Sequence, residues 1–125
     1  MERPLDVLAE QVRMALSEGD ISAFATLLDP HVTWGAPRAR NPTCKNRNQV
    51  LDWYRRAQES GIHGEVVDVE VIGDHLLVSL LVRGSESARE RGSAAQRYQV
   101  LTVRDDRIID IVGFDDKAEA LSHGR

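Results

Sequence analysis

The hydrophobic period of this chain changes once along its length, and that change restricts the possible folds more than any other feature. Up to residue 60, apolar residues recur every three or four positions, which is the spacing of one helix face. From residue 65 onward they recur at every second position, which is the spacing of a β-strand. Helices followed by an antiparallel sheet predict an α+β domain in which the helices pack on one face of the sheet.

Three helices are expected before the strands, with a short extended segment at residues 31–34 between the second and the third. The first helix ends near Gly19, the second follows the capping residue Asp20, and the third follows Asn46, which forms a capping box with Gln49. Their apolar faces are Leu5, Leu8, Val12 and Leu16; Ile21, Phe24, Leu27 and Leu28; and Val50, Trp53, Tyr54 and Ala57.

Four strands are expected in the second half, joined in pairs by two-residue turns at Gly73-Asp74 and Asp105-Asp106. Both faces of the last hairpin are substantially apolar, although a sheet with one solvated face normally alternates apolar and polar residues. We therefore expect the helices to cover one face and a partner subunit to cover the other, which predicts a homodimer. The expected strands are residues 65–72, 75–83, 95–104 and 107–115.

Asp110 is the leading catalytic candidate that the residues themselves provide. A two-residue turn at 105–106 places its side chain on the same face as Arg97 and Gln99, which would then donate hydrogen bonds to a ligand. Burial raises the pKa of a carboxylic acid toward the range in which it exchanges protons at neutral pH. The alternative is that this face forms the rim of the dimer contact, with Asp110 paired to an arginine. The apolar residues expected beside it are Leu101, Val103, Ile108, Val112 and Phe114.

A ligand pocket is mostly apolar with a few polar anchors, so aromatic residues are candidates for its wall. Trp34, at the end of the short extended segment, is the best of them, and Val112 and Phe114 are further ligand-binding candidates. The stripe spacing of Tyr54 favours a place in the core instead. No two of the four histidines have the spacing of a metal site, so neither a metal nor another cofactor is expected.

Cys44 is the only cysteine, and it lies just before the third helix beside Lys45 and Arg47. A thiol near a helix N-terminus and two cations could be an activated nucleophile. No histidine is close to it in the sequence, and a cysteine nucleophile usually needs a base. We therefore favour a small apolar packing role for Cys44, with the nucleophile as the alternative.

Composition limits the class of protein. A length of 125 residues fits one domain spanning residues 1–125. A formal net charge of −4 argues against a nucleic-acid-binding surface, which needs a concentrated basic face. A single cysteine excludes an internal disulfide, the first ten residues lack the apolar core of a signal peptide, and no apolar run approaches the roughly 18 residues of a membrane span. We expect a cytoplasmic protein with neither a membrane nor a nucleic acid as partner.

Two segments carry a resemblance to a known family. Residues 98–121, "YQVLTVRDDRIIDIVGFDDKAEAL", resemble the closing hairpin and tail of SnoaL-like proteins in the nuclear transport factor 2-like superfamily. Residues 15–34, "ALSEGDISAFATLLDPHVTW", are similar to the first two helices and the short strand of the same family. The resemblance implies a cone, with the three N-terminal helices packed in the concavity of a strongly curved antiparallel sheet. It also implies a pocket at the wide end and a dimer across the outer face of the sheet.

The family includes cyclases, dehydratases, steroid isomerases, epoxide hydrolases and members without catalysis, so the fold does not settle the function. The catalytic positions of the steroid isomerases fall at Val12, Trp34 and Gln99, where the required side chains are absent, and this activity is therefore not expected. SnoaL-type cyclases use an aspartate near the end of the last strand, which points to Asp115 or Asp116. The alternative is that these acids cap the strand or a short helix after it.

The sequence therefore predicts a protein that binds a small, mostly apolar organic molecule in a cone-shaped pocket. A cofactor-free acid–base reaction on a ring compound, such as cyclisation, isomerisation, dehydration or hydrolysis, would extend this function. Whether the protein is an enzyme stays open at this point. The alternative is a noncatalytic dimerisation or protein-interaction module whose cone is closed by its own side chains.

Overall fold

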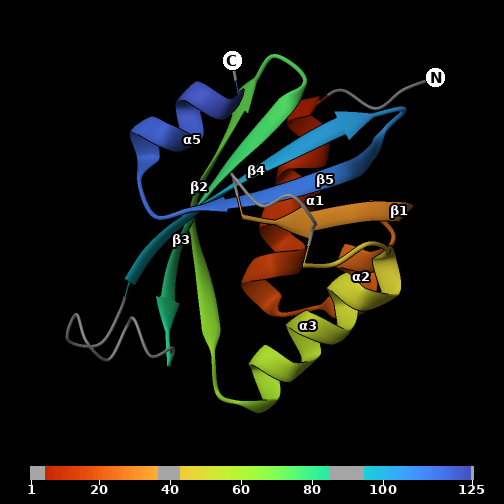
Figure 1. Cartoon of the computed structure of the whole chain (residues 1–125), viewed down its shortest axis with the longest axis vertical. Helices are drawn as coiled ribbons and strands as arrows, with labels where there is room; N and C mark the ends of the chain where they lie inside the picture. Colours follow the sequence, from red (N-terminus) through yellow and green to blue (C-terminus); the bar gives the residue numbers. More distant parts are fainter. Residues whose placement is uncertain (1–4, 37–42, 85–94, 125) are drawn as a thin grey trace.

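The computed structural model describes residues 5–36, 43–84 and 95–124, which form an α+β fold with a curved, unclosed sheet (Figure 1). Helices come first and strands second, as the change of hydrophobic period predicts. The elements are α1 (Leu5–Glu18), α2 (Ile21–Ala25), β1 (Leu28–Gly35), α3 (Arg47–Glu59), β2 (His63–Ile72), β3 (His75–Arg83), β4 (Ala95–Arg104), β5 (Arg107–Phe114) and α5 (Lys117–Gly124).

The sheet has the strand order β1-β5-β4-β3-β2. Strands β2 to β5 pair antiparallel in chain order, and β1 adds to the edge of β5 in the parallel direction. Because β1 is an edge strand, it tolerates Pro30, which lacks a backbone N–H for a ladder. Figure 1 shows α3 alongside β1 at one end of the molecule and α5 at the other.

Each face of the sheet has its own buried cluster. The inner face packs against α1, α2 and α3, and it includes Leu76, Val78, Leu101 and Ile111. The outer face packs against α5, and its buried residues are Leu77, Val100, Val112, Phe114 and Ala120. The expectation that helices fill the concavity is confirmed, and α5 is an additional helix that covers the opposite face. The surface that a partner subunit was expected to cover is therefore partly occupied by the chain itself.

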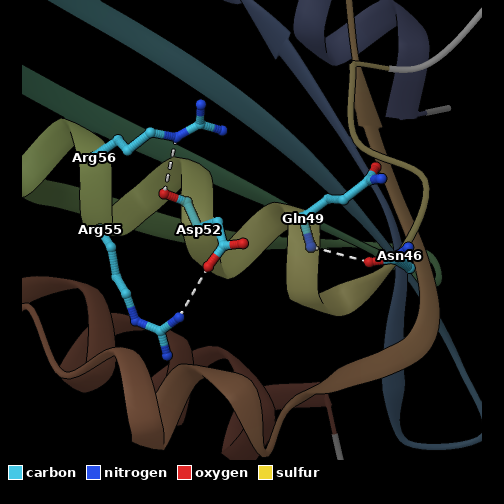
Figure 2. Close-up of polar contacts among 5 residues, drawn as sticks. All are labelled: Asn46, Gln49, Asp52, Arg55 and Arg56. Carbon is cyan, nitrogen blue, oxygen red and sulfur yellow. Dashed lines mark hydrogen bonds and ion pairs between the residues drawn. The ribbon is translucent and has the colours of Figure 1, made fainter.

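The third helix begins as its capping signal predicts. Asn46 has extended backbone geometry, and its carboxamide oxygen accepts a hydrogen bond from the backbone N–H of Gln49 at 2.9 Å (Figure 2). The Gln49 side chain reaches back to the N–H of Lys45 at 2.8 Å, one residue earlier than in the usual capping box. On the exposed side, Asp52 pairs with Arg55 at 3.1 Å. This cap fixes where α3 starts, and so which of its side chains face the sheet.

The expected second helix is wrong at its C-terminal end. Helix α2 stops at Ala25, and Leu27 and Leu28, which were expected on its apolar face, lie outside it. Leu28 instead opens β1, where it pairs with Ile108 of β5, and both leucines are buried. The apolar spacing was compatible with helix or strand, and sheet pairing decided between them.

Two irregularities in strand pairing change the predicted faces. Both two-residue turns form, but the ladder shifts by one residue between Val66 and Asp68 in β2 and between Ile108 and Asp110 in β5. A two-residue turn at Gly73-Asp74 with no shift would pair Val67 with Leu80. The first shift pairs Leu80 with Val66 instead and leaves Val67 outside the ladder and 63% exposed. The second shift moves the residues that follow it in β5 to the opposite face.

No helix within the described residues is both long and apolar enough to cross a membrane.

Candidate functional site

A cavity of about 720 Å³ lies between the helices and the inner face of the sheet. Helices α1, α2 and α3 contribute the side toward the helices, and β1, β2, β3 and β4 contribute the side toward the sheet. Its lining is mostly apolar, including Leu80, Val82 and Ala57. The volume is in the range typical of pockets for small organic molecules.

One wall of the cavity is aromatic. Trp34 from β1 lies 4.4 Å from Trp53 and 5.1 Å from Tyr54, measured between ring centroids, and both partners come from α3. Phe24 from α2 meets the Tyr54 ring edge-on at 5.3 Å. Trp53 is 40% exposed, so this aromatic cluster continues from the interior to the surface. Stacked and edge-on rings of this kind form a rigid apolar surface on which a flat molecule can pack.

Two polar groups are buried within the cavity wall. Gln99 on β4 is 8% exposed, and its side-chain oxygen has no hydrogen-bond partner within the described part of the chain. The Tyr54 hydroxyl is also buried without such a partner there, and Tyr54 is one of the residues that line the cavity. Burial raises the pKa of Tyr54, while the nearby Gln99 amide opposes the rise and Cys44 adds slightly to it. The Tyr54 hydroxyl and the Gln99 amide are thus close enough to interact, but their geometry is not that of a hydrogen bond.

Arg97 lines the cavity from β4, and it connects the cavity to the end of β5. Its Nη1 atom donates a hydrogen bond to Asp115, with which it also forms an ion pair. Asp115 itself is exposed and lies beyond the lining. The neighbouring carboxylate therefore holds the guanidinium at the cavity edge.

Polar groups also mark the end of the cavity formed by the α1–α2 connection. Glu18 and Asp20 are exposed there, and Asp20 caps α2 by accepting from the N–H of Ala23 at 3.0 Å. Gln58 on α3 donates to the carbonyl of Gly19 at 3.1 Å and so connects the two helical segments. Asp20 and Gln58 are therefore held in place by hydrogen bonds within the protein itself.

Asp110 lies on the outer face of the sheet, and the predicted register is wrong at this point. It pairs with Thr102 of β4, not with Leu101, because the ladder shift inserts one extra residue before it. Its carboxylate accepts a hydrogen bond from the Thr33 hydroxyl at 2.7 Å, and it does not line the cavity. A catalytic role for Asp110 stays a prediction, and it would require a site on the outer face.

The same shift places Val112 and Phe114 in the outer cluster under α5. There the ring centroid of Phe114 lies 5.3 Å from that of His123. Neither residue lines the cavity, whereas the other three ligand-binding candidates, Trp34, Arg97 and Gln99, are brought together in its wall. Asp116 accepts a hydrogen bond from the N–H of Glu119 at 3.1 Å. This is the helix-capping role that was the alternative to catalysis for Asp115 and Asp116.

Cys44 is 3% exposed and belongs to the inner cluster. Its backbone forms two hydrogen bonds with Trp34, at 2.9 and 3.0 Å, and these fix the segment before α3 against β1. Burial raises the pKa of the thiol, and the Arg56 charge offsets only part of that rise. A neutral buried thiol is a poor nucleophile, so the geometry supports the packing role.

Gly113 was not among the sequence candidates, although it lies opposite Gln99 and faces the cavity edge. A glycine inside a strand often marks a close approach of another group, and this signal could have identified it. Among the described residues no cluster of three or more His, Cys, Asp or Glu side chains could hold a metal ion.

The family model of the SnoaL-like domain matches residues 9–111. No curated protein matches the sequence.

Solved structures match the fold. A proposed polyketide cyclase from Sinorhizobium meliloti is 23% identical with a TM-score of 0.64, over 83% of this chain and 90% of that one. A proposed ketosteroid isomerase from Kribbella flavida is 18% identical with a TM-score of 0.69, over 89% and 76%. A protein of ketosteroid isomerase-like fold from Catenulispora acidiphila, in complex with trimethylamine, is 19% identical with a TM-score of 0.62, over 94% and 90%.

Proposed function

This chain belongs to the SnoaL-like domain family, and on that premise we propose that it binds a small, mostly apolar, ring-containing organic molecule in the inner-face cavity. The observation that carries the proposal is the cavity of about 720 Å³ with its aromatic wall. A space of this size between the described residues favours an occupant other than the protein's own side chains. It thereby argues against the alternative of an interaction module with a closed cone.

A cofactor-free acid–base reaction on the bound molecule is the finer part of the proposal. Asp115 supports it, because this acid is held by Arg97, whose side chain lines the cavity. Asp115 is also one of the two residues, with Asp116, to which the family resemblance pointed. Hydrogen bonds from Arg97 and Gln99 would orient the molecule and stabilise negative charge that develops on an oxygen. The homodimer and the cytoplasmic location expected from the sequence are proposed with it.

Ligand binding is tested by thermal unfolding of the purified protein against a panel of polycyclic ketones, polyphenols and fatty acids. A ligand at about a hundred times its dissociation constant adds roughly 2.7 kcal/mol to the free energy of unfolding, so we expect a clear rise in melting temperature for one chemical class. No shift for any class would contradict the proposal and would favour the interaction module.

A pair of helix variants shows whether binding uses this cavity. Ala57→Leu on α3 fills part of the cavity, whereas Ala118→Leu adds the same volume to an exposed position of α5. We expect Ala57→Leu to abolish the ligand-dependent shift and Ala118→Leu to retain it. An equal shift in both variants would place the ligand elsewhere.

A further inference from the structure

At Gly113 the place that a side chain would take lies between Arg97 and Trp34, and we call this place the niche. A Cβ atom placed on Gly113 would lie 3.6 Å from the Nη2 atom of Arg97 and 4.0 Å from the Nε1 atom of Trp34. Among the residues that the structure describes, no other atom outside the adjoining residues lies within 4 Å of that point. Both neighbours are nitrogen atoms that carry hydrogen, and both of their side chains line the cavity.

Strand pairing explains why these groups converge. Gly113 on β5 pairs with Gln99 on β4, and Arg97 lies two residues along β4 on the same face. On the other side, β1 pairs with β5 so that Trp34 lies next to Ile111 on the inner face. The strands β1 and β4, which lie on either side of β5, thus direct side chains of different types toward one point, and the glycine of β5 adds none there.

The guanidinium of Arg97 is already oriented for this niche. Its Nη1 atom is occupied by Asp115, while Nη2 is the atom nearest the open point. A planar guanidinium that one carboxylate holds on one nitrogen can still donate through the other. Asp115 therefore acts here as a positioning residue, and Arg97 keeps a donor directed toward the cavity.

Two convergent N–H donors, one of them charged, recognise an anionic oxygen better than a neutral one, because charge-assisted hydrogen bonds are about twice as strong. The Gln99 side chain lies opposite Gly113, and its oxygen, which lacks a partner within the described residues, is an acceptor. Only the NH2 group of this amide can therefore add a donor for an anion. Trp34 belongs to both the niche and the aromatic wall. A ligand that packs a ring on that wall can therefore place an attached group in the niche.

We propose that the ligand is a ring-bearing carboxylate whose acid group occupies the niche beside Gly113 and accepts hydrogen bonds from Arg97 and Trp34. This inference rests on the proposed function, since it names the chemical class of molecule that the same cavity binds. The ring packs against Trp34 and its aromatic neighbours, and the carboxylate carries the specificity.

The first test compares acids with their neutral esters. Binding of 2-naphthoate, cinnamate and indole-3-acetate, and of the methyl ester of each, is measured by calorimetry with the wild-type protein, Arg97→Gln and Arg104→Gln. Arg104 lies on the same strand at the distant turn and serves as the matched control. We expect at least one acid to bind about tenfold more tightly than its ester, and this preference to disappear in Arg97→Gln but not in Arg104→Gln.

The second test fills the niche directly. In Gly113→Ala the new methyl group makes ordinary van der Waals contacts and needs no unusual backbone angle, so we expect an unchanged melting temperature without ligand. The methyl group narrows the space between Arg97 and Trp34 that the carboxylate would enter, so we expect acid binding to fall at least tenfold. Unchanged acid binding in a folded Gly113→Ala protein would overturn the inference.

The outcomes separate this inference from the function on which it rests. Esters that bind as tightly as acids, with the shift still lost in Ala57→Leu, would overturn the carboxylate and leave the cavity as a binding site. Loss of acid preference in both arginine variants would overturn it too, because the effect would then reflect overall charge. Failure of acids, esters and the broader panel to bind would overturn both proposals.

Discussion

Tyr54 combines a ring that stabilises the cavity wall with a hydroxyl group that has no hydrogen-bond partner among the described residues. Leaving a buried hydroxyl unpaired costs about 1–3 kcal/mol. We therefore expect Tyr54→Phe, which keeps the ring, to raise the free energy of unfolding at pH 7 by about 1 kcal/mol. Urea unfolding of the two proteins measures the difference. A loss of stability would mean that the hydroxyl pairs with Gln99 in solution.

The same residue gives a pH dependence with a defined sign. Burial raises the pKa of Tyr54 above its ordinary value of 10.0, so the folded protein keeps this proton after the unfolded chain has lost it. The free energy of unfolding should therefore fall as the pH rises above about 10. Urea unfolding between pH 8 and 11 should show a steeper decline for the wild type than for Tyr54→Phe. Parallel curves would contradict this assignment, and Tyr98→Phe provides the matched control.

At the scale of elements, the end of β3 approaches the connection between α3 and β2. Gly84 has a φ of +82°, and a Cβ atom there would lie 2.2 Å from the carbonyl oxygen of Gly61, which is backbone and cannot rotate away. Gly73, in the β2–β3 turn, also has a positive φ of +60°, but no atom of the described part of the chain lies within 4 Å of its Cβ position. A side chain at Gly84 would therefore meet both a steric clash and an unfavourable backbone angle, whereas one at Gly73 would meet only the unfavourable backbone angle.

We expect Gly84→Ala to cost more than Gly73→Ala. A left-handed backbone costs a non-glycine residue about 1–2 kcal/mol, and this applies to both variants. The clash with Gly61 adds an overpacking cost of about 1–3 kcal/mol to Gly84→Ala alone. Melting temperatures or urea unfolding give the comparison. Equal losses of stability in the two variants would show that the end of β3 and the α3–β2 connection separate without cost, and that this end of the cavity opens readily.

At the scale of the whole molecule, the proposed homodimer would form across the outer face of the sheet. Helix α5 packs on β3, β4 and β5 on that face, so a dimer that uses it would have to form around α5. Light scattering coupled to size-exclusion chromatography should report twice the 14.0 kDa of one chain if the proposed dimer forms. A mass of one chain at micromolar concentration would contradict the dimer and leave the cavity proposals untouched.

The sequence by itself determined the class of fold, because that depends on local signals. The change of period separated helices from strands, Asn46 and Gln49 marked the start of α3, and the two acidic turn residues Asp105 and Asp106 defined the last hairpin with positive φ angles of 51° and 68°. Each of these signals lies within a few neighbouring residues. Trp34, Arg97 and Gln99 were ligand-binding candidates from the sequence, and the structure brings them together in the cavity wall, while their binding of a ligand stays a prediction.

Only the tertiary structure decided which face each side chain joins. One extra residue near Ile109 shifts the ladder, and because side chains alternate at a period of two, it sends Asp110, Val112 and Phe114 to the outer face. The same shift brings Gly113 opposite Gln99 and opens the niche beside Arg97. Such a shift depends on pairing between distant strands, and the residues around the turn do not reveal it.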